Sequence, residues 1–233
     1  MERRRLSVIS LIFGRDGNDI GRMALLRNKY VNNMCGRYCI EETEQFKEII
    51  EEMMNSPLVK LWQDMAVITT SGEIRPTDIA PVIAMNRRGE RAVFPMKWGF
   101  KEKALLINAR VETADAKTTF REAWKLHRCI IPASYYYEWD HITGENGKKK
   151  TGDRYIIQPE KVGMTWLCGL YRFEGNMPVF VILTREPGAA VSKIHDRMPL
   201  ILPEHLVDEW IRPDADPAEL VGQSLTEVVL EKG

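Results

Sequence analysis

The chain contains 233 residues, of which 44% are hydrophobic and 28% are charged, a composition typical of a globular protein with one sizeable core. The formal net charge is zero, so the overall field does not attract nucleic acid, and a nucleic-acid partner requires a local basic cleft. No apolar run approaches the roughly 20 residues that span a bilayer, so we expect no membrane association.

Residues 1–34 differ in charge from the rest of the chain. They carry seven Lys or Arg and three Asp or Glu, a net charge of +4, and the remaining residues carry −4. Arg3–Arg5 precede a brief apolar stretch, Leu6–Phe13, as in a signal peptide, but no small-residue cleavage site follows. We therefore expect residues 1–34 to be an extension that is disordered, removed or not translated, and residues 35–233 to be a single domain.

Sequence periodicity predicts the elements of the N-terminal half. Apolar residues from Phe46 to Met54 recur with helical spacing, and a polar Arg-Arg-Gly-Glu turn separates two apolar runs as in a hairpin. The expected elements are a helix over 42–54, hairpin strands over 82–86 and 91–98, a strand over 105–107 that ends before Asn108, and a helix over 119–125.

The C-terminal half is predicted to be rich in strands. The polar stretch 140–153 is typical of an exposed hairpin loop. Strands without regular βαβ alternation favour an α+β fold with a largely antiparallel sheet. The expected elements are strands over 129–131 and 135–139, broken at Pro132, strands over 154–158, 165–173 and 178–184, and helices over 189–194 and 204–211.

The cysteines exclude some kinds of site. Four cysteines in a chain of this length do not make a disulfide framework, and they suit a reducing cytoplasm. Cys35 and Cys39 have the spacing of metal ligands, but no second pair accompanies them, so we predict no metal site. The other two are Cys129 and Cys168.

Met34-Cys35-Gly36-Arg37 reads like the start of a protein. A methionine before a small residue can be trimmed, which leaves a free α-amine beside the Cys35 thiol. Such an aminothiol condenses with an aldehyde to an imine, and the thiol then closes a thiazolidine ring. With the extension attached, the nitrogen of Cys35 is an amide, so this chemistry requires either translation from Met34 or self-cleavage before Cys35.

Several polar segments at predicted strand ends supply further candidates. Taken singly, each has an ordinary explanation: Glu138 as a surface carboxylate, His195 as a helix cap, Trp98 as a core residue. Their joint occurrence changes the interpretation. The segments are Arg75–Asp78, Lys97–Gly99, Asn108–Thr113, Tyr136–Trp139 and Ile194–Pro199.

Together with Met34–Arg37, these segments resemble the SRAP family, the SOS response-associated peptidases, from Cys35 to about Trp210. The resemblance implies a single SRAP-type α+β domain, with largely antiparallel strands in a barrel-like sheet and flanking helices. It also implies binding of single-stranded DNA and a covalent thiazolidine crosslink to abasic sites, without a cofactor. The most specific matches are Met34–Arg37, Asn108–Thr113, Arg128–Trp139 and Ile194–Pro199.

The resemblance assigns roles to individual positions. Cys35 matches the family's nucleophile, and three further positions match its active-site asparagine, glutamate and histidine, namely Asn108, Glu138 and His195. Other positions fall in segments that line the DNA cleft in relatives: Arg37, Pro76, Trp98, Arg110 and Thr184.

The physical chemistry of these residues fits such roles. We expect desolvation between Tyr137 and Trp139 to raise the pKa of Glu138, so that it shuttles protons near neutral pH. Arg37 is expected to lower the pKa of the Cys35 thiol and, with Arg110, to grip phosphates. An exposed aromatic ring is expected to stack on a base beside the lesion.

Two other interpretations remain open. An amidase or peptidase of the N-terminal-nucleophile type would use Cys35, with its own amine as base and Asn108 as oxyanion donor. A non-enzymatic single-stranded-DNA binder would bury Cys35 and show salt-dependent binding without a covalent product. Arg37 and Arg110 favour DNA, and we expect a cytoplasmic monomer of the DNA damage response that joins the nucleoid when bound to DNA.

Overall fold

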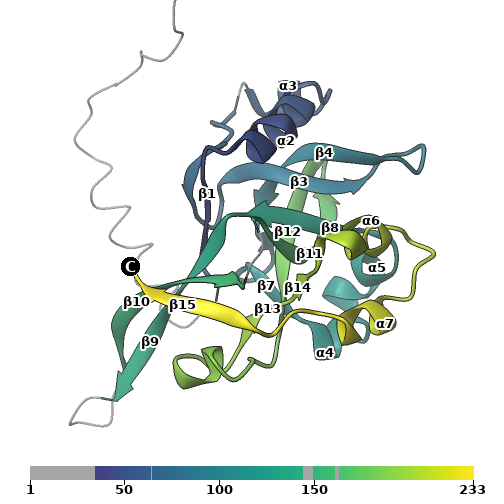
Figure 1. The fold of residues 1–233 in the computed structure, drawn as a ribbon. Helices are drawn as coiled ribbons and strands as arrows, with labels where there is room; N and C mark the ends of the chain where they lie inside the picture. Colours follow the sequence, from purple (N-terminus) through teal and green to yellow (C-terminus); the bar gives the residue numbers. More distant parts are fainter. Residues whose placement is uncertain (1–34, 64, 144–148, 161–162) are drawn as a thin grey trace, which may run out of the picture. The chain divides into compact units, whose positions relative to one another are not determined.

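The computed structural model describes residues 35–63, 65–143, 149–160 and 163–233. Strands predominate and helices flank them, which confirms the predicted α+β class (Figure 1). Within these ranges, no helix combines the length and the apolar character that a bilayer crossing demands.

Five strands close into a barrel, which confirms the predicted barrel-like sheet. The ring runs β12, β4, β3, β8 and β11 and returns to β12, and all neighbours are antiparallel except β12 and β4, which run parallel. Closure leaves no free edge in the ring. The strands are β3 (Ile79–Met85), β4 (Arg91–Trp98), β8 (Arg128–Ala133), β11 (Thr165–Glu174) and β12 (Met177–Arg185).

Short strands extend the barrel at β11 and β12. β7 (Asn108–Arg110) runs parallel to β12 and pairs Asn108 with Ile182. β13 (Met198–Pro199) pairs with the end of β12, and β14 (Ile201–Leu202) pairs with β11. The small hairpin of β5 (Phe100–Lys101) and β6 (Leu105–Leu106) precedes β7.

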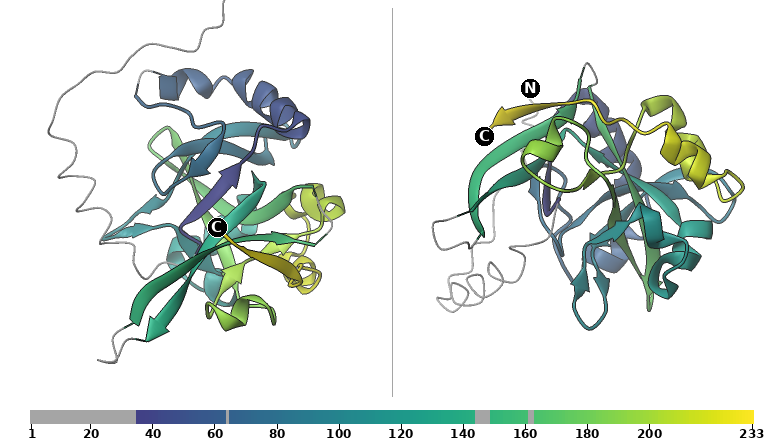
Figure 2. Two further views of the ribbon diagram at one scale, coloured as in Figure 1. Left: turned by 60° about the vertical axis from the view of Figure 1, so that its left-hand side comes forward. Right: turned by 90° about the horizontal axis from the view of Figure 1, so that it is seen from below.

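A second, antiparallel sheet has the strand order β15-β10-β9-β1-β2. Its strands are β1 (Arg37–Ile40), β2 (Gly72–Ile74), β9 (Tyr135–Thr143), β10 (Lys149–Pro159) and β15 (Val228–Lys232). β9 and β10 form a long hairpin that extends away from the barrel strands in both Figure 1 and Figure 2. The predicted loop over 140–153 is therefore wrong at both ends, because polar residues at each end pair as strands of this hairpin.

The helices pack on the barrel strands. Apolar spacing predicted the first one: α2 buries Phe46, Ile49 and Met53, and the Thr43 hydroxyl caps it by accepting from the Phe46 N–H. Figure 1 shows α2 and α3 beside β3 and β4, and α5 and α6 nearer β8 and β11. The helices are α2 (Glu44–Met54), α3 (Val59–Gln63), α4 (Val111–Ala114), α5 (Thr118–Leu126), α6 (Val207–Trp210) and α7 (Pro217–Gly222).

Three local predictions differ from the structure. Pro132 does not break its strand, because it lies inside β8 beyond the point where Ile130 pairs with β3. The helix predicted over 189–194 is only a 3-10 turn, Val191–Lys193. The helix predicted over 204–211 begins as a 3-10 turn, Glu204–Leu206, before α6.

Arg128 ties the C-terminal helices to the barrel. Its side chain is 2% exposed, and its guanidinium donates to the carbonyls of Trp210 at 2.8 Å and Trp124 at 2.9 Å. It also donates to the carbonyls of Lys125, Arg212 and Ala215. Trp124 and Lys125 lie in the last turn of α5, and Trp210 is the last residue of α6, where carbonyls lack helical partners. One buried cation therefore supplies donors to the end of α5 and to the turn after α6.

We expect Arg128→Met to reduce the free energy of unfolding by about 3–5 kcal/mol, because it leaves several buried carbonyls without donors. Urea denaturation measures the loss. The exposed Arg121 on α5 offers a matched control, and Arg121→Met should change stability by less than about 0.5 kcal/mol. Equal unfolding midpoints for the two variants would show that water replaces the guanidinium at no cost.

Candidate active site

The centre of the site is a hydrogen bond between Cys35 and Glu138. The Cys35 backbone N–H donates to Glu138 Oε2 at 2.9 Å, and the Trp139 N–H donates to Oε1 of the same carboxylate at 3.2 Å. Cys35 has no exposed surface, and Glu138 is 4% exposed. The antiparallel pairing of β1 with β9, which sets Arg37 opposite Tyr137, holds the two residues together.

The alternation of side chains along β9 divides the motif Tyr136–Trp139 between two faces. Tyr136 and Glu138 share one face, and Tyr38 on β1 lies opposite Tyr136. Tyr137 and Trp139 share the other face. There the Arg37 guanidinium lies 5.4 Å from the centre of the Trp139 ring.

Burial places the pKa of Glu138 near neutrality. Removal of the carboxylate from water raises its pKa to about 7, and the charge of Asp196 adds to this effect, although the N–H donors of Cys35 and Trp139 oppose it. The predicted rise is therefore present in the structure. Near pH 7 both the acid and the carboxylate are populated, as a proton shuttle requires.

The Cys35 thiol is poised differently from the prediction. Burial, with the nearby charge of Glu138, raises the pKa of the thiol well above its ordinary value. The prediction that Arg37 lowers this pKa is wrong, because the Arg37 guanidinium pairs with the Glu73 carboxylate at 2.6 Å. The sulfur is therefore a neutral thiol at physiological pH.

His195 lies at a point where either protonation state finds a partner. Its Nδ1 is 3.2 Å from the Arg197 backbone N–H and 2.9 Å from an Asp196 carboxylate oxygen. A neutral ring accepts from the backbone N–H, and a protonated ring donates to the carboxylate. This arrangement gives His195 two stable states within one backbone geometry.

Arg197 fixes the segment that carries His195. Its guanidinium donates to both carboxylate oxygens of Glu112, at 2.6 and 2.7 Å, and to the Thr184 carbonyl at 2.7 Å. Partial burial, the largest single effect, would raise the pKa of Glu112, but the hydrogen bonds and charge of Arg197 together with backbone N–H donors lower that pKa. The ion pair thereby joins the His195 segment to α4 and to the end of β12.

A buried tryptophan links the backbone next to Asn108 to strand β1. The Trp98 indole N–H donates to the carbonyl of Ile107, the residue before Asn108, at 2.9 Å. The Trp98 ring packs against Tyr38, with centroids 5.4 Å apart. These contacts connect the start of β7 to β1, which leads directly from Cys35.

Two of the predicted DNA contacts are buried. Trp98 has no exposed surface, so the prediction that it lines a DNA cleft is wrong, because its ring is enclosed between Tyr38 and Phe180. Thr184 is 2% exposed, and its hydroxyl donates to the Ala109 carbonyl at 3.4 Å, so it supports β7 instead of a ligand. Arg110, by contrast, is exposed at the end of β7.

Pro76 occupies a strained turn. The Asp78 N–H donates to the Arg75 carbonyl at 3.0 Å, and Thr77, at the third position of the turn, has φ +82°. Glycine is the usual residue at such a position, since a β-branched side chain is strained there. Strain of this kind gathers at functional sites, and the turn leaves Pro76 partly exposed.

Trp139 is a surface residue that the sequence reasoning missed. It is partly exposed beneath the Arg37 guanidinium and follows Glu138 directly. The signal was available, because alternation along Tyr135–Trp139 places Trp139 on the opposite face from the buried Glu138. Trp139, not Trp98, therefore offers the exposed aromatic ring beside the site.

All four cysteines are free and buried: Cys35, Cys39, Cys129 and Cys168. Across the part of the chain that the structure describes, no group of three or more His, Cys, Asp or Glu residues is placed to hold a metal ion.

The fold and the site define a protein in which a small β-barrel supports a buried cysteine whose nitrogen faces a carboxylate. The family model for the SOS response associated peptidases, SRAP, matches residues 34–231, and the chain belongs to this family.

Two curated relatives share most of this length. The abasic site processing protein YoqW of Bacillus subtilis (strain 168) is 30% identical over 204 residues, covering 79% of this chain and 83% of that protein. The abasic site processing protein YedK of Escherichia coli (strain K12) is 28% identical over 197 residues, covering 80% of this chain and 83% of that protein.

Solved structures share the fold. A phage-related protein of Bordetella bronchiseptica has a TM-score of 0.64 at 22% identity, covering 85% of this chain and 94% of that chain. A protein from Bacteroides thetaiotaomicron has a TM-score of 0.63 at 20% identity, covering 85% of this chain and 91% of that chain.

The pKa of Glu138 makes stability depend on pH. Because the folded-state pKa of about 7 exceeds the ordinary value of 4.5, the carboxyl group stabilises the fold most at low pH and loses this contribution as pH rises through 7. Relative to Glu138→Gln, the wild-type free energy of unfolding should fall by roughly 2 kcal/mol between about pH 5 and pH 8. Urea titrations at several pH values measure this fall in the free energy of unfolding. Glu51→Gln, at an exposed position on α2, is the control. A constant difference would mean that Glu138 ionises as readily as a surface carboxylate.

Proposed function

We propose that this protein processes abasic sites in single-stranded DNA by forming a thiazolidine crosslink through Cys35. The observation that carries the proposal is the 2.9 Å hydrogen bond from the Cys35 nitrogen to the buried Glu138 carboxylate. It sets the atom that must attack an aldehyde against an acid–base group with a pKa of about 7. The names of YoqW and YedK as abasic site processing proteins support a role in the processing of abasic sites.

The Cys35 nitrogen must first become an amine. Translation from Met34 followed by removal of the methionine achieves this, and so does self-cleavage. In self-cleavage the Cys35 sulfur attacks the carbonyl carbon of residue 34, the C–N bond breaks, the nitrogen gains a proton, and water hydrolyses the thioester. The φ of +46° at Cys35 favours cutting, because a non-glycine residue is strained by about 1–2 kcal/mol there and the torsion is released with the preceding bond.

The crosslink then forms in two steps. The neutral amine attacks the C1′ aldehyde of the ring-opened sugar, and water leaves as the imine forms. The thiol sulfur next adds to the imine carbon, and its proton passes to the nitrogen, so the net reaction loses one water. The raised thiol pKa fits this order, since the amine acts first and the sulfur adds as a neutral thiol.

Glu138 serves both steps as the proton shuttle. It accepts a proton from the attacking amine and returns it to the departing hydroxyl. Burial disfavours a charged ammonium on Cys35 beside a charged carboxylate on Glu138. The amine and the carboxylate therefore share one proton, for which their affinities are similar. Asn108 and His195 are proposed to hold the sugar oxygens and the adjoining phosphate.

The proposed DNA surface combines Arg37, Arg110, Pro76 and Trp139, all at least partly exposed. The Arg37 side chain is 35% exposed, and a partly exposed ion pair such as Arg37–Glu73 contributes at most about 1 kcal/mol, so a phosphate can replace Glu73. A base beside the lesion then stacks on Trp139, a contact that tolerates any sequence.

We expect a protein that begins at Cys35 to gain the mass of an abasic single-stranded oligonucleotide less one water, as measured by intact mass spectrometry. Cys35→Ala keeps the α-amine but cannot close the ring, so it should form only a hydrolysable imine and leave no product that survives prolonged heating without a reductant. Reversible DNA binding should stay within about twofold, since only the ring-closing group is lost. Cys39→Ala, at another buried thiol on β1, should crosslink normally.

Two outcomes would contradict the proposal. A heat-stable crosslink formed by Cys35→Ala would show that ring closure by the Cys35 thiol is not what makes the product permanent, and would assign the linkage to another nucleophile. Salt-dependent binding without any covalent product, from a protein shown to begin at Cys35, would leave only a reversible DNA binder. Hydrolysis of an unrelated amide by the same preparation would favour the N-terminal-nucleophile amidase.

Glu138→Gln should slow crosslinking by about 100-fold or more, the usual contribution of a general acid–base group, with little change in DNA affinity. The wild-type rate should also depend on a group that titrates near pH 7, and the variant should lose this dependence. Single-turnover kinetics over a pH series separate the rate from binding. Equal losses of rate and affinity would show that Glu138 only supports the fold.

A further inference from the structure

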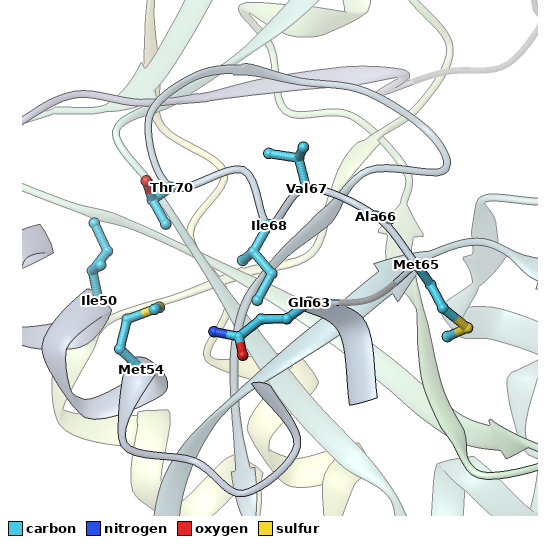
Figure 3. A pocket seen from close by; sticks show the side chains of 8 residues that line it. All are labelled: Ile50, Met54, Gln63, Met65, Ala66, Val67, Ile68 and Thr70. Atoms are coloured by element: carbon cyan, nitrogen blue, oxygen red, sulfur yellow. The ribbon is translucent and has the colours of Figure 1, made fainter. Parts of the chain in front are cut away.

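An apolar groove lies between α2 and the segment that leads from α3 to β2. Its volume is about 710 Å³. Figure 3 shows Ile50 and Met54 on α2 facing the chain that follows α3. The Ile68 side chain of that chain is directed into the space between it and α2. The remaining lining residues are Gln63, Met65, Ala66, Val67 and Thr70.

Several large apolar side chains of α2, α3 and the segment after α3 are exposed. Val67 is 85% exposed, Met65 62%, Met54 47% and Leu61 39%. Among the described residues, the only other large hydrophobic side chains exposed to this extent are Leu126 and Phe173, which lie on α5 and β11. Exposed apolar side chains that gather in one region of the chain are typical of a protein-binding site.

The exposed side of α2 makes the rim of the groove acidic. Glu44, Glu48 and Glu51 follow one another along the helix with i, i+4 and i+3 spacing, and Glu51 stands one turn from Met54. The intervening Lys47 is already paired with Glu44 at 2.9 Å. This rim repels DNA phosphates and anionic lipids and attracts a cationic partner.

We propose that the groove binds a helical segment of another protein that carries an apolar stripe flanked by Lys or Arg. An amphipathic helix suits a groove formed by a helix and a loop, and its basic flanks would meet the glutamates of α2. Met54 and Met65 suit such a role because flexible thioethers adapt to different apolar side chains. None of the residues assigned to abasic-site chemistry lines the groove, so the proposal stands independently of that function.

Binding is tested with a fluorescent peptide of leucine and lysine, about 15 residues long, whose leucines repeat at i, i+3, i+4 and i+7. Fluorescence anisotropy with the full chain should show saturable binding. A peptide with glutamate in place of lysine should bind at least about tenfold more weakly, because the acidic rim repels it.

Matched variants locate the site. Val67→Asp should weaken binding at least about tenfold, whereas Phe173→Asp, at another exposed apolar position, on β11, should change it less than about twofold. The double change Glu48→Lys and Glu51→Lys should reverse the preference between the two peptides. Because Val67 and both glutamates are exposed, circular dichroism should show unchanged folding.

Three results would overturn the proposal. The first is equal affinity of the leucine–lysine peptide for wild type and Val67→Asp, which would show general attraction to an acidic protein. The second is the absence of saturable binding. The third is a Val67-dependent dimer in sedimentation, which would assign the groove to a second copy of this chain.

Discussion

The hydrogen bond between the Cys35 nitrogen and the Glu138 carboxylate depends on one strand pairing and governs the chemistry of the site. It forms only if β1 and β9 keep the register that sets Arg37 opposite Tyr137, since a shift of one residue would turn Glu138 to the other face. The same register buries the carboxylate and so raises its pKa to about 7. The register of β1 and β9 thus determines the burial of Glu138 and its affinity for a proton.

Strand β12 joins the remaining parts of the site. It pairs with β11 and β4 in the ring, and it also pairs with β7 and β13. Asn108 therefore starts a strand that β12 positions, and Arg197 ties the His195 segment to the Thr184 carbonyl at the end of β12. β7 and β13, which are far apart in the sequence, therefore lie along the same strand.

The sequence predicted local elements better than their connections. The apolar spacing of α2 and the polar turn between β3 and β4 depend on neighbouring residues, so both elements were found. The raised pKa of Glu138 was also expected, since two aromatic residues flank it. Two failures depend on distant contacts: the pairing of Arg37 with Glu73 and the enclosure of Trp98 between Tyr38 and Phe180. The ends of β9 and β10 were missed for another reason, because polar composition alone does not separate a loop from paired strands.

The buried, neutral thiol of Cys35 has a bearing on how the protein would withstand oxidants. Peroxides and disulfides react with thiolates, and the raised pKa of Cys35, together with its complete burial, keeps the thiolate scarce and inaccessible. A cysteine in this state resists conversion to the sulfenic acid under conditions that oxidise exposed, acidic thiols. The burial that raises the pKa of the thiol therefore also shields the sulfur from oxidants.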